Sequence, residues 1–334
     1  MRQLLRVKEL HTSFSSLSKK IRAVRGVNFA LYRGEALGIV GESGCGKSVM
    51  AKSIIRLLPS VSSQIERGSI LYKGSDILEK SEQELQHIRG KEIGMIFQDP
   101  MTALNPTMKI GKQIIEGYIL HYPHVTDRDV KTRLFKLLEQ VGITDGPSRI
   151  NQYPGELSGG IRQRVMISIA IMSAPQILIA DEPTTALDVT IQAQILELLR
   201  KIQQEEGMSI MLITHDLSVI ANFCNRVIVM YAGKIVEQAL IKDIFLSPKH
   251  PYTRRLLHSI PRLDFPHDHH LYSIYGAPPD LSSELKGCSF CARCPHAMHI
   301  CQEKDPIDFE IQPNHYVACW LFTPYFMRNK EKER

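Results

Sequence analysis

The stretch that decides the fold of this chain is Gly41-Glu42-Ser43-Gly44-Cys45-Gly46-Lys47-Ser48. It has the form G-x-x-x-x-G-K-[ST], in which glycines let backbone N–H groups wrap the phosphates of a nucleotide. An apolar run at 37–40 precedes it, and apolar residues at helical spacing follow it to residue 58. This context separates a phosphate-binding loop from an ordinary glycine-rich turn. We expect Lys47 to bind the phosphates and Ser48 to bind Mg²⁺.

A second apolar run, at 177–180, ends in two carboxylates, Asp181 and Glu182. Short apolar runs of this kind are typical of strands that are buried on both faces of a parallel sheet. Downstream of a phosphate-binding loop, they predict that Asp181 holds Mg²⁺, directly or through water. They also predict that Glu182 is the general base for the attacking water. Considered without that loop, the pair is equally a strand cap with solvated acids.

The remaining pattern indicates an α/β fold. Strand patterns occur at 27–31, 36–40, 68–72, 93–97, 177–180 and 209–213, and helical patterns at 47–58, 127–141, 161–172 and 190–206. Strands that alternate with helices favour a largely parallel sheet. The strand at 93–97 leads to Gln98, and the strand at 209–213 leads to His215. By themselves, these two residues are most simply a surface amide and a structural histidine. Prolines interrupt the pattern after about residue 247, so we expect a domain boundary near residue 245.

Composition narrows the class of protein. A chain of 334 residues with 43% hydrophobic and 23% charged residues is ordinary globular protein, not a disordered chain. Its net charge of +6 is too small to demand nucleic acid as a partner. The first ten residues lack the apolar core of a signal peptide, and no apolar stretch reaches the ~20 residues of a membrane-spanning helix. We therefore expect a protein that stays in the cytosol.

Five of the seven cysteines lie close together near the end of the chain: Cys288, Cys291, Cys294, Cys301 and Cys319. In the cytosol, such a cluster indicates metal binding or redox chemistry rather than a disulfide framework. Four thiolates bind an iron–sulfur cluster or a structural Zn²⁺, and reduced thiols without a metal are the third possibility. The C-x2-C-x2-C spacing leaves Cys291 as a possible ligand. It does not decide between an iron–sulfur cluster, a Zn²⁺ site and reduced thiols.

The run Leu-Ser-Gly-Gly-Ile-Arg-Gln-Arg at 157–164 resembles the signature motif of ABC ATPases. It lies between the phosphate-binding loop and the acidic strand, as in that family, and residues 185–188 resemble the family's D-loop. The resemblance covers about residues 4–245. It implies a P-loop NTPase core of the ABC ATPase type in which a helical subdomain is inserted at about 99–160. Ile161 stands where the commonest signature has Gln, and members of the peptide-importer branch often carry an apolar residue there.

In ABC ATPases two nucleotide-binding domains pack head to tail and enclose ATP between them, so the resemblance implies a second ATPase chain as partner. Ser158, Gly159 and Gly160 would bind the ATP of that partner, since a helix begins there and its free N–H groups suit a γ-phosphate. Gln98 corresponds to the Q-loop residue that serves Mg²⁺, and His215 to the switch histidine that senses the γ-phosphate. Phe14 corresponds to the aromatic residue that stacks on adenine.

Residues 246–334 resemble the C-terminal extension of oligopeptide, dipeptide and nickel importer ATPases, beginning with His-Pro-Tyr-Thr at 250–253. Some members of this branch hold a [4Fe–4S] cluster in that extension. By position, the ligands here are Cys288, Cys294, Cys301 and Cys319, and Cys291 departs from the pattern. The expected role of the cluster is structural, because a small proline-rich segment gains stability from a metal.

The resemblance implies the ATPase subunit of a peptide importer, peripheral on the cytoplasmic face of the inner membrane. Its expected partners are a different ATPase chain, two transmembrane permease subunits and, indirectly, a substrate-binding protein, with no nucleic acid. One alternative is a nickel or metal-chelate importer. A histidine-rich patch, formed by His267, His269 and His270, is the feature that suggests it. The other is a soluble ABC ATPase that acts on DNA or ribosomes, which commonly carries two motif sets or long coiled-coil insertions.

Overall fold

The computed structural model describes residues 2–16, 19–185, 187–259 and 274–323. The histidine-rich patch lies outside the described residues. The chain divides into two compact units, each of which is described by itself. Unit 1 comprises Leu31–Ala36, Tyr72–Ile213 and the first residues of the chain, and unit 2 comprises Arg6–Ala30, Leu37–Leu71 and the described residues from Thr214 onward.

The sheet of unit 1 consists of three parallel strands in the order β8-β7-β6, whose bounds are β6 (Ile93–Ile96), β7 (Ile177–Asp181) and β8 (Ser209–Ile213). Ile177 pairs with Ile93 on one side and with Ser209 on the other. Every residue of the three strands is buried, as the apolar runs predicted. The unit also contains β5 (Ser75–Asp76) and the short 3-10 turns Ile77–Glu79 and Pro154–Glu156.

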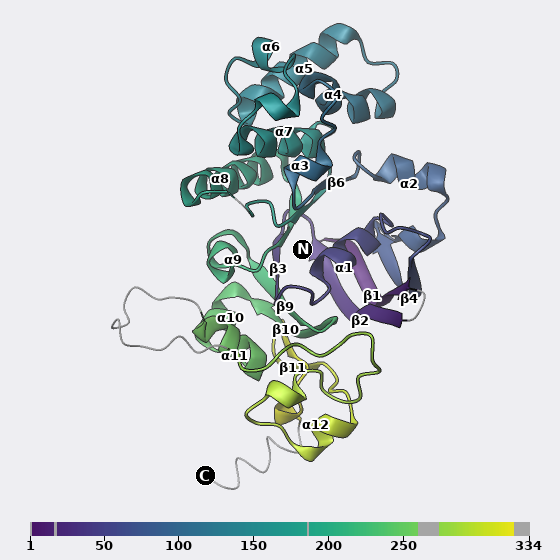
Figure 1. The fold of residues 1–334 in the computed structure, drawn as a ribbon, viewed down its shortest axis with the longest axis vertical. Coiled ribbons are helices and arrows are strands. Elements are labelled where there is room, and N and C mark those ends of the chain that lie inside the picture. The colour runs from purple at the N-terminus through teal and green to yellow at the C-terminus, as the bar shows by residue number, and fades with distance from the viewer. Residues whose placement is uncertain (1, 17–18, 186, 260–273, 324–334) are drawn as a thin grey trace. The chain divides into compact units, whose positions relative to one another are not determined.

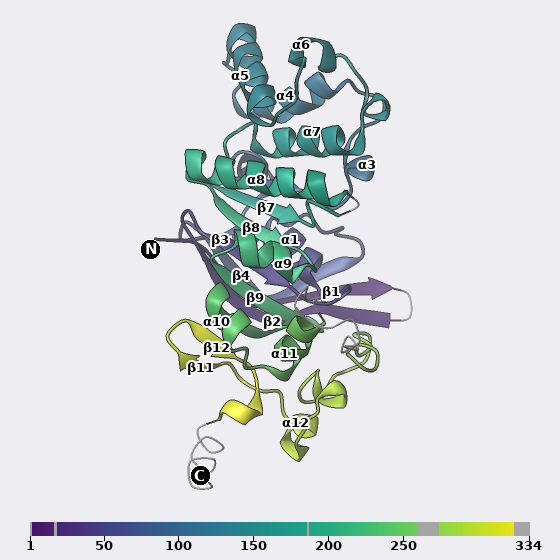
Figure 2. The ribbon, with the colours of Figure 1, turned by 90° about the vertical axis from the view of Figure 1, so that its left-hand side faces the viewer.

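Seven helices of unit 1 are described: α2 (Glu82–Ile88), α3 (Pro100–Ala103), α4 (Ile110–His121), α5 (Asp127–Gln140), α6 (Gly146–Arg149), α7 (Gly159–Ile171) and α8 (Val189–Glu206). Of these, α4, α5, α6 and α7 lie together (Figures 1 and 2). The amphipathic pattern of residues 127–141 is confirmed as α5, which buries Val130, Leu134, Leu137 and Leu138. The hydroxyl of Thr126 caps this helix by accepting from the backbone N–H of Asp129.

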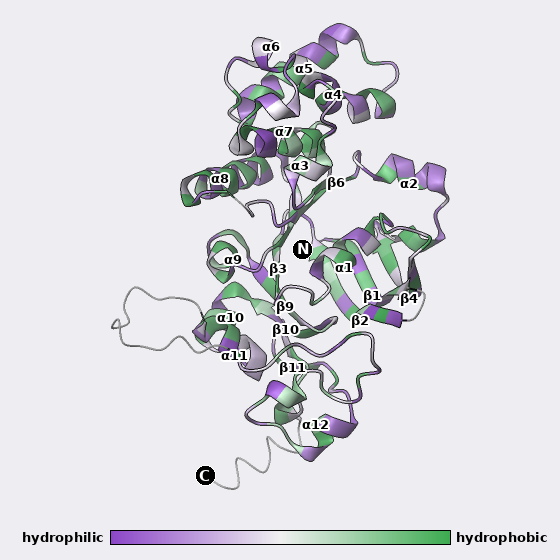
Figure 3. Ribbon diagram, in the orientation of Figure 1, coloured by the Kyte–Doolittle hydropathy of each residue, from purple (hydrophilic) through white to green (hydrophobic). Residues whose placement is uncertain are grey.

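Unit 2 holds most of a sheet in the strand order β2-β1-β4, with bounds β1 (Gln3–Ser16), β2 (Lys19–Tyr32) and β4 (Ser63–Tyr72). Its second sheet has the order β11-β12-β10-β9-β3. Here β3 (Ala36–Val40) runs parallel to β9 (Arg226–Tyr231), and β10 (Lys234–Leu240) runs antiparallel to β9. The edge is formed by β11 (Phe309–Gln312) and β12 (His315–Val317), also antiparallel. The buried strands are mainly hydrophobic, whereas α2 of unit 1 is mainly hydrophilic (Figure 3).

The helices of unit 2 are short: α1 (Lys47–Ile54), α9 (Leu217–Phe223), α10 (Ile241–Leu246), α11 (Pro251–His258) and α12 (His299–Glu303), with 3-10 turns at Cys291–Arg293 and Trp320–Phe322. The helix predicted over 47–58 was too long, because Arg56 adopts a left-handed φ of 51° and Pro59 follows it. Among the described residues, none of the helices has the length and apolar character needed to cross a bilayer.

Candidate functional site

The phosphate-binding loop connects β3 to α1 within unit 2, as the motif predicted. Gly46 is the N-cap of α1 and has a φ of 99°, and a Cβ at this position would lie 2.2 Å from the carbonyl oxygen of Ala23. Only glycine therefore fits. The buried Lys47 ammonium donates to the carbonyl oxygens of Gly41 at 2.8 Å and Glu42 at 3.1 Å. A cation thus lies over the loop, at the end of a helix that favours an anion.

The backbone N–H groups of Gly44 and Gly46 have no acceptor among the described residues. A buried amide without a partner is costly, and Gly46 is buried. Beside a lysine, a phosphate oxygen is a suitable acceptor for the hydrogen bonds that such amides donate. The loop therefore fits the phosphates of a nucleotide.

The two carboxylates at the end of β7 differ in their surroundings, both within unit 1. Asp181 is the last residue of the strand and is only 2% exposed. Glu182 is half-buried and has a φ of 48°, a left-handed conformation that a non-glycine residue keeps only where its surroundings hold it. Its carboxylate Oε2 accepts from Nε2 of Gln98 at 3.1 Å and from the hydroxyl of Thr185 at 2.8 Å. The carboxylate predicted to activate water is therefore fixed in orientation.

The signature residues begin α7, also in unit 1. Ser158 is the N-cap of that helix, and both Ser158 and Gly159 are exposed, so the first N–H groups of the helix face outward. Farther along, the buried Gln163 donates from Nε2 to the carbonyl oxygen of Pro183 at 2.6 Å. Sequence reasoning missed this bond, which joins the signature helix to the segment directly after Glu182.

Unit 2 holds the phosphate-binding loop together with His215 and Phe14. His215 follows β8 and is exposed, and Phe14 is half-buried on β1. Unit 1 holds Gln98, Asp181, Glu182 and the signature residues. The contacts described above join Gln98 to Glu182 in unit 1 and Lys47 to its own loop in unit 2. The roles assigned to Phe14, His215 and the signature residues remain predictions.

Neighbouring thiols add to the raised pKa values of four clustered cysteines in unit 2, namely Cys288, Cys291, Cys294 and Cys319. Burial raises the pKa of Cys288 to about 12, and the charges of Cys301, Cys319 and Cys294 add to the rise. Burial likewise raises the pKa of Cys319 to about 11. The charge of Cys301 also raises the pKa of Cys291, and the charge of Cys291 in turn raises the pKa of Cys294. Cys301 and Cys319 are buried, and the N–H of Cys288 donates to the carbonyl oxygen of Cys301 at 2.7 Å.

The described residues as placed do not form a ready metal site. No three His, Cys, Asp or Glu side chains among them are arranged to hold a metal ion. The ligand set Cys288, Cys294, Cys301 and Cys319 therefore remains a prediction.

Comparison with known proteins identifies two regions of the chain. Residues 24–185 match the family described as "ABC transporter". Residues 236–301 match the family described as "Oligopeptide/dipeptide transporter, C-terminal region". The first region contains the phosphate-binding loop, the signature and the two carboxylates. The second contains part of the cysteine cluster.

Curated relatives match nearly the whole chain. It is 52% identical over 322 residues to the oligopeptide transport ATP-binding protein OppD of Bacillus subtilis, covering 96% of this chain and 90% of the relative. It is 50% identical over 321 residues to the dipeptide transport ATP-binding protein DppD of the same organism, covering 96% and 95%. The OppD protein of Escherichia coli is 45% identical over 317 residues, covering 95% and 93%.

Solved structures agree on the fold. A dimeric ATP-binding cassette in a post-hydrolysis state, bound to ADP and Pi, has a TM-score of 0.64 and 28% identity, covering 71% of this chain and 98% of that one. The cbiO1 protein of Clostridium perfringens, part of an ABC transporter complex, has a TM-score of 0.63 and 28% identity, covering 74% and 92%. With the motifs in order and both family regions matched, the chain belongs to the ABC transporter ATPases, in the group of the oligopeptide and dipeptide transport ATP-binding proteins.

Proposed function

We propose that this chain hydrolyses ATP to drive the uptake of peptides across the cytoplasmic membrane, as the ATPase subunit of an ABC importer. The observation that carries the proposal is the match to peptide-transport relatives over nearly the full length of the chain. That match includes residues 236–301, which match the family described as "Oligopeptide/dipeptide transporter, C-terminal region", and not only the shared ATPase core.

In this function, Lys47 and the loop amides bind the phosphates of ATP, and Phe14 stacks on adenine. Ser48, Gln98 and Asp181 hold Mg²⁺, which neutralises charge on the phosphates when bound. Glu182 takes a proton from the attacking water. His215 contacts the γ-phosphate. The carboxylate orientation set by Gln98 and Thr185 supports the role of Glu182.

The chain works as one half of a pair of ATPase subunits, in which the exposed start of α7 serves the ATP of its partner. We assign residues 1–245 to the nucleotide-binding domain, with the helical subdomain at about 99–160, and residues 246–334 to the C-terminal extension. The helical subdomain contacts two permease subunits, and a substrate-binding protein delivers peptides to them. The chain is thereby held at the cytoplasmic face of the membrane.

For the cysteine segment we propose a [4Fe–4S] cluster held by Cys288, Cys294, Cys301 and Cys319, with Zn²⁺ as the alternative ion. The burial of Cys301 and Cys319, and the hydrogen bond from the N–H of Cys288 to the carbonyl oxygen of Cys301, support grouping these residues as ligands. Because their present placement does not fit a metal ion, no step of ATP hydrolysis is assigned to the cluster.

Uptake measurements in a strain that lacks the gene test the function. We expect the deletion to abolish uptake of labelled peptides while leaving nickel uptake intact. The wild-type gene should restore peptide uptake, and a Lys47→Ala gene should not. Loss of nickel uptake alone would make the chain a metal-importer subunit. Co-purification with ribosomes or DNA, without membrane proteins, would contradict a transport function.

A further inference from the structure

The second residue of the phosphate-binding loop is held from two directions by the C-terminal region, meaning the described residues from 246 onward, all within unit 2. Oε2 of Glu42 accepts from Nη1 of Arg293 at 2.8 Å, and the arginine side chain is only 6% exposed. The backbone N–H of Glu42 donates to the hydroxyl oxygen of Tyr252 at 2.9 Å. Both Tyr252 and Arg293 lie in the region that matches the oligopeptide/dipeptide transporter family.

Arg293 is itself held by several hydrogen bonds. Its Nε donates to the carbonyl oxygen of Tyr275 at 3.0 Å, and its Nη2 donates to the carbonyl oxygen of Ile274 at 3.0 Å. Its Nη1 also reaches the hydroxyl of Tyr231 at 3.2 Å. An arginine fixed in this way loses little further freedom in its ion pair with Glu42, unlike a pair of mobile surface side chains.

Tyr252 is equally fixed, but by packing. It is fully buried, and its ring lies 4.7 Å from that of Tyr231 and 5.4 Å from that of Phe290, measured between centroids. Aromatic contacts of this kind leave the hydroxyl a single position. The acceptor for the Glu42 N–H is therefore set by the C-terminal region.

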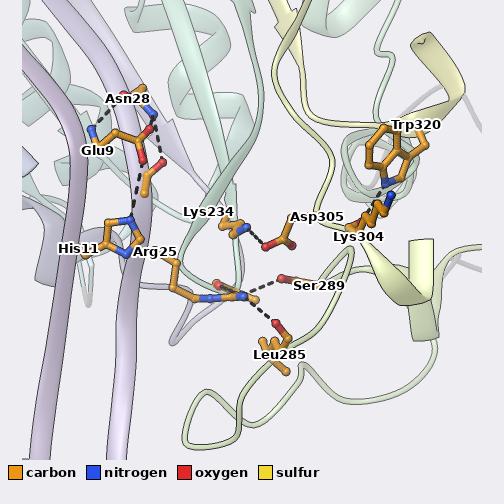
Figure 4. A network of polar contacts seen from close by, with 12 residues as sticks. Glu9, His11, Arg25, Asn28, Lys234, Leu285, Ser289, Lys304, Asp305 and Trp320 are labelled. Carbon is orange, nitrogen blue, oxygen red and sulfur yellow. Dashed lines mark hydrogen bonds and ion pairs between the residues drawn. The ribbon is translucent and has the colours of Figure 1, made fainter. Parts of the chain in front are cut away.

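Contacts that do not involve the phosphate-binding loop anchor the C-terminal region independently. Arg25 of β2 donates to the hydroxyl of Ser289 at 2.8 Å and points toward the carbonyl of Leu285 (Figure 4). Lys234 of β10 pairs with Asp305 at 2.6 Å in the same view. Arg293 thus meets Glu42 from a segment whose placement does not depend on that residue.

The geometry points to Arg293 as a positioning residue for ATP binding, acting with Tyr252 through Glu42; this role rests on the proposed function of the loop. Glu42 connects the C-terminal region to the phosphate-binding lysine. Its carbonyl oxygen accepts from Nζ of Lys47, its carboxylate accepts from Arg293, and its N–H donates to Tyr252. Fixing Glu42 fixes the start of the loop and the lysine above it. The C-terminal region therefore sets the affinity of the loop for ATP.

Binding of Mg-ATP to the purified full chain, measured by calorimetry, tests this role. Arg293→Gln and Glu42→Gln should each raise the Kd about tenfold, the cost of one charged hydrogen bond. The double variant should bind as weakly as either single variant, because both remove the same ion pair. Tyr252→Phe keeps the buried ring and should also raise the Kd. Asp305→Asn breaks a comparable ion pair of the same region away from the loop and should leave the Kd unchanged.

The two substitutions could instead weaken ATP binding additively, so that the double variant has a higher Kd than either single variant. Arg293 would then act through its bonds to the backbone of residues 274–275 and not through Glu42, which would overturn the role. An unchanged Kd for Arg293→Gln or Tyr252→Phe would do the same, as would an equal rise for Asp305→Asn. If Arg293→Gln does not fold, the Kd of Tyr252→Phe decides. A wild-type chain that fails to bind Mg-ATP would instead refute the proposed function.

Discussion

Gln98 donates a hydrogen bond to Glu182 at 3.1 Å across 84 positions of sequence. The bond joins the segments that follow β6 and β7, two neighbouring parallel strands. Parallel strands bring their carboxyl ends to the same edge of a sheet, which is where ligands bind in open α/β folds. The proposed catalytic carboxylate is therefore oriented by a neighbouring strand and not only by its own loop.

Glu182→Gln should reduce ATP turnover at least ~100-fold, because the amide cannot accept the proton of water. The variant should still bind ATP and should accumulate as an ATP-bound dimer. Phosphate release and light scattering measure the two effects. Glu139→Gln, an exposed residue of α5, is the matched control and should leave turnover unchanged. Normal hydrolysis by Glu182→Gln would remove this residue from the catalytic assignment.

Gln98→Ala should lower kcat about tenfold, because one hydrogen bond that orients Glu182 is lost and the proposed Mg²⁺ ligand is removed. Steady-state kinetics at several Mg²⁺ concentrations measure the change. Gln140 donates to Glu205 at 3.2 Å elsewhere in unit 1 and offers a control of the same chemistry. Gln140→Ala should leave kcat unchanged. Equal kcat values for the wild type and Gln98→Ala would contradict the positioning of Glu182.

Gly46→Ala should abolish detectable ATP binding, because the new Cβ would meet the carbonyl oxygen of Ala23 at 2.2 Å and the loop would have to shift. Gly34 also has a positive φ, of 72°, but a Cβ there meets no atom within 4 Å. Gly34→Ala should therefore cost about 1 kcal/mol of stability with no loss of ATP affinity. Thermal unfolding and calorimetry separate the effects. Wild-type affinity in Gly46→Ala would contradict the tight fit of the loop.

Acid should destabilise the protein through His250. Burial lowers the pKa of His250 to about 4, although the charge of Glu237 opposes the shift. Its Nδ1 accepts from the N–H of Tyr252 at 3.1 Å, so the folded protein requires the neutral ring. A pKa below that of the unfolded chain means that stability is full above about pH 6.5. It should fall by about 3 kcal/mol as the pH drops toward 4.

Urea unfolding at about pH 7.5 and about pH 4.5 measures this loss. His250→Asn keeps an acceptor at the N-cap of α11 and removes the titration. The variant should therefore lose less stability in acid than the wild type. An identical acid loss in both proteins would assign the pH dependence to other groups.

The proposed cluster ligands lead to a prediction for the metal content of the protein. Purified without oxygen, the chain should be brown and contain about four iron atoms, the content of a [4Fe–4S] cluster. Cys294→Ser should remove the iron, whereas Cys291→Ser should retain it, because only the first is a proposed ligand. A colourless chain that contains zinc would replace the cluster with a structural Zn²⁺ site. Iron loss in Cys291→Ser would overturn the choice of ligands.

The parts of the fold that depend on local sequence were predictable. The phosphate-binding loop lies between β3 and α1 because glycines and a lysine specify that turn over eight residues. The amphipathic α5 follows from residue periodicity, and the buried β7 and β8 follow from short apolar runs, both of which are local features. The end of α1 was missed because Arg56 takes a left-handed conformation that its residue type does not favour.

The contacts that tertiary structure selects were not predictable. Arg293 and Glu42 are separated by 251 positions, and neither residue type specifies the other as a partner. Gln163 likewise finds the carbonyl oxygen of Pro183 only because α7 packs beside the segment after β7. The residue type determines whether a side chain can donate or accept, but the tertiary structure determines which buried donor lies next to which acceptor.

The pairing of β12 with β10 makes the C-terminal region part of the sheet. Glu237 of β10 lies opposite Val317, and β10 is already paired with β9 on its other side. Without β12, a strand with an apolar, buried side would present a row of unpaired backbone groups to water. Such an edge recruits strands from other chains. A chain truncated before β12 should therefore aggregate, so the extension protects the solubility of the ATPase.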